Sequence, residues 1–459
     1  MRRPLNVQEA EAVKNVPKMV LASNIKVPET FDSKATYPFH YEVIGHDELP
    51  HVVKFSGGRS SGMMLFMLLE NDFLKPKRGD VIIFNDTSAE HPETYNFTAK
   101  CKRIAEEQYG IPFFWIQFQT YEDARGGKWV RLPTYRLVKP VPWSADKPDG
   151  YHWKGEAFEE LLSWSGYVPN QFQRTCTQNL KLEVTRQFLR DWFACKDRTN
   201  RLGHYGGGSR MDDDTMYAYH QKHRGKVPKE IFLEKKSYVR SRPVFRDEQF
   251  FSDFSRITQS IDNPYLTGKQ FGGNAAFGDG GIEYVTFVGL RYDEMRRVIK
   301  VQRRNSGGPE ANGYEGEHVY MPLAKIGVTK EDVDEFWNNQ NWGLNLPSEA
   351  GLSNCVYCFL KGAGALRKVH KQMEAAKEKT ASAIDSPCDI NWWKRMELRY
   401  GRDLKAEKRV LQKKERAGAV IGFFGIESGF SYDLLGKSDN RKTDLSKFTK
   451  TVLPCDCTD

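Results

Sequence analysis

Residues 51–69 read HVVKFSGGRSSGMMLFMLL, which places a short apolar run before a glycine- and serine-rich loop and a longer apolar run after it. This order predicts a strand, a phosphate-binding loop and a helix. In such a loop, glycines let backbone amides approach phosphate oxygens, and hydroxyls and the helix N-terminus supply further donors. The spacing is not that of a Walker A loop, and a flexible turn is the alternative. The candidate phosphate-binding residues are Ser56, Gly57, Gly58, Arg59, Ser60, Ser61 and Gly62.

Strands and helices alternate after this loop. Residues 80–86 (DVIIFND) and 111–118 (IPFFWIQF) have the composition of buried strands, and residues 92–109 between them have that of a helix with proline at its start. This alternation predicts an α/β fold with a parallel sheet, helices on both faces and ligands at the carboxyl ends of the strands. The further expected elements are helices at 177–193 and 329–342, a strand at 284–290, lysine-rich helices beyond 364 and an irregular segment over the site at about 125–170.

The length of 459 residues suggests two or three packed units. The pattern divides the chain into an N-terminal extension (1–45), a first part of the nucleotide-binding core (46–200), an insertion rich in glycine and charge (201–283), a second part of the core with a Cys-x-x-Cys pair (284–365) and a helical C-terminal region (366–459) that ends in CDCTD.

Composition limits the classes of protein to consider. Hydrophobic residues make up 39% of the chain and charged residues 28%, and no run of 18 apolar residues occurs, so a membrane protein is not expected. The N-terminus lacks the apolar stretch of a signal peptide, which predicts a cytoplasmic protein with reduced thiols. A formal charge of +9 permits an anionic partner, nucleotide or nucleic acid, without requiring one.

Four of the eight cysteines are candidate metal ligands. Cys355 and Cys358 form a C-x-x-C pair that suits zinc or an iron–sulfur cluster, because both thiolates can reach one metal or cluster. No second such pair follows at zinc-ribbon distance, so further ligands must converge from far along the chain, which favours a cluster. Cys176 is the third candidate, and the tail supplies either a fourth ligand, Cys457, or none. Zinc and inert buried thiols remain alternatives.

Charged residues beside these motifs are the candidates for catalysis. Asp86 ends a predicted strand, and its carboxylate suits Mg²⁺ or a nucleotide hydroxyl, although a turn or N-cap role fits equally well. Arg174 adjoins Cys176, and Arg291 follows the strand at 284–290; a guanidinium can clamp a phosphate or sulfate through two bonds. Arg303 and Arg304 could contact nucleic acid.

Seven stretches of the sequence occur in an order that resembles the phosphoadenosine phosphosulfate (PAPS) reductase-like family of the adenine nucleotide alpha hydrolase superfamily. The resemblance is to the divergent phage and prophage subgroup, in which SGGR, then Ser or Thr, then SG replaces SGGxDS. Ser60 therefore stands where the common loop has an acidic residue. The stretches are FSGGRSSG (55–62), FNDTSAEHPETYNF (84–97), KGEAFEELL (154–162), RTCTQNLKLEVT (174–185), VGLRYDEMRRV (288–298), MPLAKIGVTKEDVDEFW (321–337) and GLSNCVYCFLKGAG (351–364).

The resemblance implies a PP-loop core that binds ATP or a related adenine nucleotide, with Mg²⁺, and a 4Fe–4S cluster held by the cysteines. Relatives in DNA phosphorothioation and tRNA thiolation split ATP between the α and β phosphates, adenylate an acceptor oxygen and let sulfur displace AMP. An ATP pyrophosphatase-type sulfurtransferase is therefore expected, with DNA or tRNA as acceptor and a cysteine desulfurase or a reductant protein as a further partner.

Two other functions compete with this expectation. The first is a PAPS or adenylyl sulfate reductase that releases sulfite, but the C-terminal E-C-G-L-H segment of such oxidoreductases is absent. The second is a non-catalytic module that binds nucleotide or nucleic acid and uses the metal centre only for structure.

Overall fold

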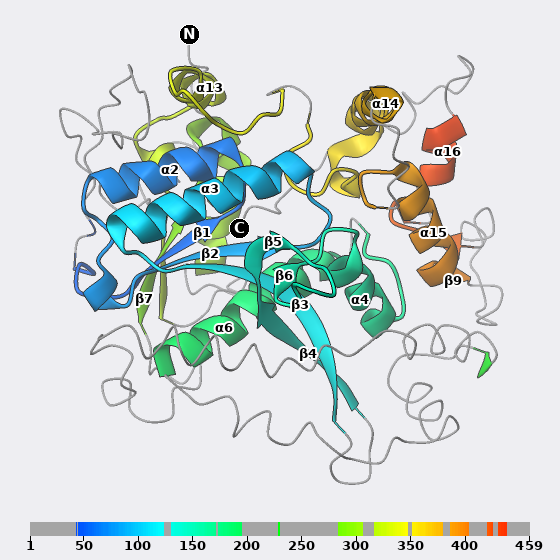
Figure 1. Cartoon of the computed structure of the whole chain (residues 1–459), viewed down its shortest axis with the longest axis horizontal. Coiled ribbons are helices and arrows are strands. Elements are labelled where there is room, and N and C mark those ends of the chain that lie inside the picture. The colour runs from blue at the N-terminus through cyan, green and yellow to red at the C-terminus, as the bar shows by residue number, and fades with distance from the viewer. Residues whose placement is uncertain are drawn as a thin grey trace.

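In the computed structural model, the six-stranded sheet at the centre of the described chain is mostly parallel (Figure 1). The strands lie in the order β4-β3-β2-β1-β7-β8, and β4 alone among them runs antiparallel to its neighbour. These strands are β1 (His51–Phe55), β2 (Val81–Asp86), β3 (Phe113–Asp123), β4 (Val130–Leu137), β7 (Tyr284–Val288) and β8 (Glu317–Tyr320). The structure describes residues 43, 45–123, 130–170, 173–194, 228–229, 283–305, 316–347, 351–379, 386–403, 420–425 and 430–437.

Helices cover both faces of the sheet, as Figure 1 shows for α2 and α3 on one face and α6 on the other. Residues 61–69 of α2 are all buried, because this helix lies between the sheet and α13. The helices of this part of the chain are α2 (Arg59–Glu70), α3 (Pro92–Tyr109), α4 (Glu156–Ser165), α5 (Thr175–Thr177), α6 (Glu183–Ala194), α11 (Met295–Asn305), α12 (Pro322–Lys325) and α13 (Lys330–Asn338).

The C-terminal elements lie beside the sheet next to α4 (Figure 1). Trp392 and Trp393 of α15 pack edge-on against Phe158 of α4, which joins this group to the main core. The elements are α14 (Gly362–Lys379), α15 (Ile390–Tyr400), β9 (Arg402–Asp403), β10 (Val420–Ile421) and α16 (Tyr432–Lys437); two short strands, β5 (Lys139–Pro142) and β6 (Gly150–Tyr151), lie near β3.

The structure confirms the α/β class and most of the expected elements, but the segment expected to be irregular is wrong in part. Residues 130–137 form the antiparallel edge strand β4, and residues 156–165 form α4. The aromatic and proline residues of this stretch obscure the sequence pattern of both elements. In β4, Pro133 is tolerated because the strand lies at a sheet edge. Most of the expected N-terminal extension, most of the insertion and the CDCTD tail lie outside the described residues.

Candidate functional site

The glycine-rich loop between β1 and α2 has a backbone that depends on its glycines. Gly57 has a φ of +76°, and a Cβ there would lie 2.7 Å from the Thr94 Cγ2. Gly58 is the N-cap of α2 and has no side chain with which to cap the first turn. Ser56 closes the loop, because its N–H and hydroxyl donate to the Ser61 Oγ at 3.2 and 2.9 Å. The first-turn amides of α2 therefore face the loop without a capping side chain, as an anion site requires.

A cavity of about 320 Å³ opens over this loop. Cationic side chains predominate around it, since four arginine or lysine residues face two carboxylates. The cavity brings together residues from the loop after β1, from α2, from the segment after β7, from α11 and α13, and from the segment before Cys355. Its lining residues are Ser56, Gly58, Arg59, Ser60, Gly289, Arg291, Glu294, Arg297, Lys330, Val333, Asp334, Leu344, Ser353 and Asn354.

Arg291 is held directly against the loop. Its Nη1 donates to the Ser60 Oγ at 3.0 Å, and its Nε and Nη2 donate to the two carboxylate oxygens of Asp293 at 2.9 and 3.0 Å. Burial alone would lower the pKa of Arg291, but the hydrogen bond to Asp293 and the charge of Glu294 raise it. Arg291 is therefore a fixed cation at the position where phosphates would bind.

Arg59 makes contacts that the sequence does not indicate. Its Nη2 donates to the carbonyls of Leu344, at 2.8 Å, and Leu346, while its own carbonyl accepts from the Trp337 Nε1 at 2.8 Å. The guanidinium thus fastens the segment after α13 to the start of α2, although it also lines the cavity. Arg174, by contrast, is half-buried next to Cys176 and does not line this cavity.

The structure brings three of the predicted cysteines together. Cys176, Cys355 and Cys358 are all buried and line one small cavity with Thr87, Phe158 and Trp393. The Thr87 hydroxyl lies 3.2 Å from the Cys355 Sγ. Cys176 lies in α5, which continues into a π-helical turn at residues 178–182, a local widening that often occurs at functional sites. Two segments far apart in the sequence therefore deliver thiols to one place.

The C-x-x-C turn is fixed by contacts that the motif does not reveal. The Lys361 Nζ donates to the carbonyls of Cys355 and Val356 at 2.7 and 2.9 Å, and the Val356 N–H donates to the Ala89 carbonyl at 2.9 Å. Asn354, just before the turn, has a φ of +61°, a conformation that asparagine tolerates better than most residues.

The cysteine cavity and the loop cavity share this one segment. Ser353 and Asn354 line the cavity over the glycine-rich loop, and the next residue, Cys355, lines the cysteine cavity. On the opposite side of the loop, Gly289 allows close approach, because a Cβ there would lie 3.0 Å from the Ser61 Cα. A ligand over the loop would thus be adjacent to the chain that carries two of the thiols.

The chemistry of this site suits an iron–sulfur cluster, because three buried thiols are surrounded by mainly apolar side chains. The cavity between the thiols is only about 10 Å³, about one water in size, so a cluster requires the side chains to move outward. Among the described residues, no group of three His, Cys, Asp or Glu residues is placed to hold a single metal ion. The fourth predicted ligand, Cys457, lies outside those residues.

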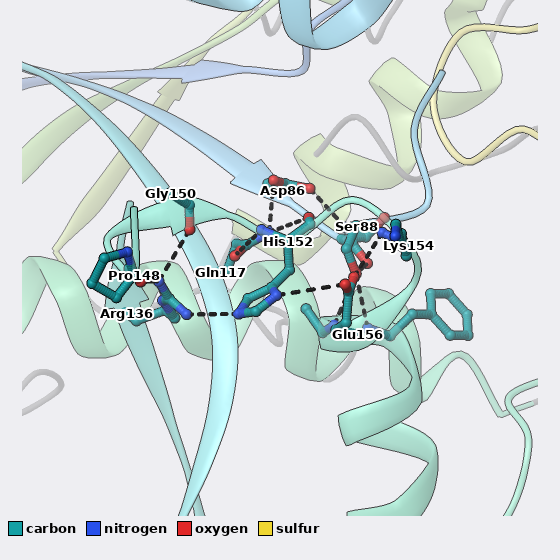
Figure 2. Close-up of polar contacts among 12 residues, drawn as sticks. Asp86, Ser88, Gln117, Arg136, Pro148, Gly150, His152, Lys154 and Glu156 are labelled. Atoms are coloured by element: carbon teal, nitrogen blue, oxygen red, sulfur yellow. Dashed lines mark hydrogen bonds and ion pairs between the residues drawn. The ribbon is translucent and has the colours of Figure 1, made fainter. Parts of the chain in front are cut away.

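Asp86 lies at the end of β2 (Figure 2). It is not among the residues that line the loop cavity. Its side chain is fully buried and accepts hydrogen bonds from the Ser88 N–H at 2.6 Å and from the Trp115 Nε1 and Gln117 Nε2, both at 2.8 Å. Burial, followed by the neighbouring Glu90 carboxylate, raises the pKa of Asp86 well above its ordinary value. Its oxygens are occupied by protein donors, so the structure gives it the role of a structural centre.

The network around Asp86 continues through His152 (Figure 2). Gln117 exchanges two hydrogen bonds with the His152 backbone, at 2.7 and 3.0 Å. The His152 ring lies between the Arg136 Nη1, 2.9 Å from its Nε2, and the Glu156 carboxylate, 3.6 Å from its Nδ1. Ser88, which is distant in sequence, caps the start of α4. Its hydroxyl accepts a hydrogen bond of 2.8 Å from the Ala157 N–H in the first turn of that helix. These contacts fix α4, and with it Phe158, beside the cysteine cavity.

Sequence reasoning missed several residues of the two cavities. Thr87, Lys330 and Lys361 lie inside stretches that carry the family resemblance, but none of them was singled out as a candidate site residue. Arg297 forms an ion pair with Glu294 at the cavity wall. Adjacency to a motif, combined with a charge or hydroxyl, was the signal available for them.

Comparison with protein-family models, with curated proteins and with solved structures finds no match for this chain. Among the described residues, no helix is both long and apolar enough to cross a membrane.

Proposed function

We propose that the protein is an adenine-nucleotide-dependent sulfur-transfer enzyme of the PP-loop ATP pyrophosphatase type, with a 4Fe–4S cluster and a nucleic acid as acceptor. One observation carries the proposal: the segment 353–358 lines the cavity over the glycine-rich loop with its first two residues and the cysteine cavity with Cys355 and Cys358. An acceptor that is activated by the nucleotide must then be reached by sulfur, so the proposed reaction needs two neighbouring sites.

The loop would bind the phosphates of the nucleotide. Amides of the first turn of α2 and the hydroxyl of Ser60 face the position of the phosphates, and Arg291 adds a charge that is already fixed in place. Preorganised donors of this kind stabilise negative charge that develops on a leaving pyrophosphate. Ser60 adds no negative charge within the loop, and the carboxylates that pair with Arg291, those of Asp293 and Glu294, follow β7 instead.

The proposed reaction has two steps. An acceptor oxygen bonds to the α-phosphorus of ATP while the bond to the β-phosphate oxygen breaks, and pyrophosphate leaves. A sulfur nucleophile then bonds to the activated atom of the acceptor, the bond to the adenylate oxygen breaks, and AMP leaves. Oxygen is a poor leaving group before it is adenylated. The reaction therefore needs a nucleotide site that activates the oxygen and a sulfur site that displaces it.

Cys176, Cys355 and Cys358 would hold the cluster, and a cluster with three cysteine ligands supplies one iron without a protein ligand. The residues of this chain have separate tasks around it. Lys361 and Thr87 fix the position of Cys355, and Phe158 and Trp393 exclude water from the thiols.

The test is release of AMP and pyrophosphate from ATP by the anaerobically purified protein in the presence of DNA or tRNA. Arg291→Gln removes the cation next to Ser60 and is expected to weaken ATP binding by about 10- to 100-fold, the effect of a lost charged hydrogen bond. Arg103→Gln, an exposed arginine on α3, is the matched control and should leave binding unchanged. Binding of ATP that is equal in both variants, or sulfite release from PAPS without ATP cleavage, would contradict the proposal.

A further inference from the structure

Helix α11 combines an apolar inner face with an unusually basic sequence. Its 11 residues, MRRVIKVQRRN, contain five arginine or lysine residues and no acidic residue. Met295, Val298 and Val301 are buried in a small cluster with Leu290 and Met321, which anchors the helix beside the end of β7. The sequence of the helix therefore contributes a net charge of +5.

Three of these cations form a row on the outer face of α11. Arg296, Lys300 and Arg303 are exposed, and their spacing of four and three residues places them on one face of the helix. The row spans about 10 Å at 1.5 Å per residue. One strand of a DNA duplex carries a phosphate for about every 3.4 Å along the axis, so a row of this length extends over about three phosphate steps.

The row begins at the nucleotide cavity. Arg297, the next residue after Arg296, lines that cavity together with Glu294, with which it forms an ion pair. Successive residues of the helix thus face in two directions, Arg297 toward the glycine-rich loop and Arg296 toward solvent. A polyanion along the outer row would lie next to the opening of the cavity.

We infer that the outer row of α11, formed by Arg296, Lys300 and Arg303, is a docking surface for the phosphate backbone of double-stranded DNA. This inference rests on the proposed function, since it names DNA as the acceptor that reaches the same site. The regular spacing of the three residues along one helix face suits a duplex, whose phosphates also have a regular spacing.

The test measures binding of a 30-base-pair fluorescent DNA duplex by anisotropy between 50 and 200 mM salt, with the full-length protein. The variant Arg296→Gln/Lys300→Gln/Arg303→Gln keeps helix propensity and the apolar face. Loss of three phosphate contacts should lower the slope of log affinity against log salt by about 2.7 and weaken binding at 100 mM salt by about 100-fold or more. The matched control, Lys368→Gln/Lys371→Gln/Arg395→Gln, removes the same charge from exposed positions of α14 and α15 and should change affinity less than about threefold.

Equal losses in the two triple variants, no DNA binding by the wild type, or preference for an RNA duplex of the same length would each overturn the inference. ATP binding is measured on the same samples to separate the two proposals. ATP binding without DNA binding would contradict the DNA surface alone, whereas absence of ATP binding would contradict the proposed function.

Discussion

The carboxyl ends of β1 and β2 are neighbours in one parallel sheet, but the space beyond the two ends is occupied differently. At the end of β1, a glycine-rich loop leaves a cavity of about 320 Å³ lined by cationic side chains. At the end of β2, Trp115, Gln117 and Ser88 donate to Asp86 and fill the space with protein. Ligands in such folds bind at strand ends, but only the first of these ends is open to receive one.

This difference shows what a strand-end position can and cannot establish. Glycines at the end of β1 remove side chains and leave backbone amides, whereas large side chains around Asp86 supply every donor that its carboxylate needs. An acidic residue at a strand end is therefore a candidate ligand only if protein donors have not already occupied its oxygens.

The largest expected effect comes from Asp86→Ala in the closed region. The substitution leaves the Trp115 and Ser88 donors buried without an acceptor, which should lower the free energy of unfolding by about 4 kcal/mol. Chemical denaturation measures this loss. The affinity of the folded fraction for ATP should stay within about twofold of wild type, since Asp86 does not line the loop cavity. Loss of ATP binding with wild-type stability would contradict the assignment of Asp86 to a closed, structural region.

A pH dependence of stability is expected from His91, in the turn between β2 and α3. Its Nδ1 accepts from the Glu93 N–H, and burial, then the charge of Lys361, lowers its pKa to about 4. As the pH falls, the unfolded chain binds the proton first, so stability is complete above about pH 6.5 and declines toward pH 4. His91→Asn keeps a good N-cap that does not titrate. Between pH 7.5 and 5 the wild type should lose about 2 kcal/mol more than this variant in denaturation experiments; parallel losses would refute the assignment.

The open region can be probed with adjacent glycines. Gly57→Ala forces a left-handed residue to carry a Cβ that lies 2.7 Å from Thr94, and it should cost about 2 kcal/mol of stability and abolish ATP binding. Gly58→Ala has an ordinary φ of −98° and a 3.5 Å contact, so it should change stability by less than about 0.5 kcal/mol. Thermal unfolding and ATP titration compare the two variants. Equal effects would mean that the left-handed conformation of the loop determines neither stability nor ATP binding.

The smallest effect is expected at the link between the two cavities. Asn354→Ala should lower stability by about 1 kcal/mol, because alanine is disfavoured at a φ of +61°, whereas Asn354→Gly should be nearly neutral. Denaturant midpoints measure both. An alanine variant as stable as the glycine variant would show that the left-handed conformation does not constrain this segment.

The sequence predicted the elements that depend on local pattern. The run 51–69 was sufficient for β1, the loop and α2, and the apolar run DVIIFND was sufficient for β2. The convergence of Cys176 with Cys355 and Cys358 was expected from their chemistry, and the structure brings the three together. By contrast, the roles of Asp86 and Arg59 depend on partners far away, such as Gln117 and the Leu344 carbonyl, which no local pattern reveals.

The most direct test of a joined nucleotide and cluster site is the iron and acid-labile sulfide content of the anaerobically purified protein. The wild type is compared with Cys355→Ala/Cys358→Ala, and with Cys101→Ala, a buried thiol in α3, as the control. The account predicts about four irons and four sulfides per chain in the wild type and the control, and their loss in the double variant. Stoichiometric zinc, or no metal in the wild type, would contradict it.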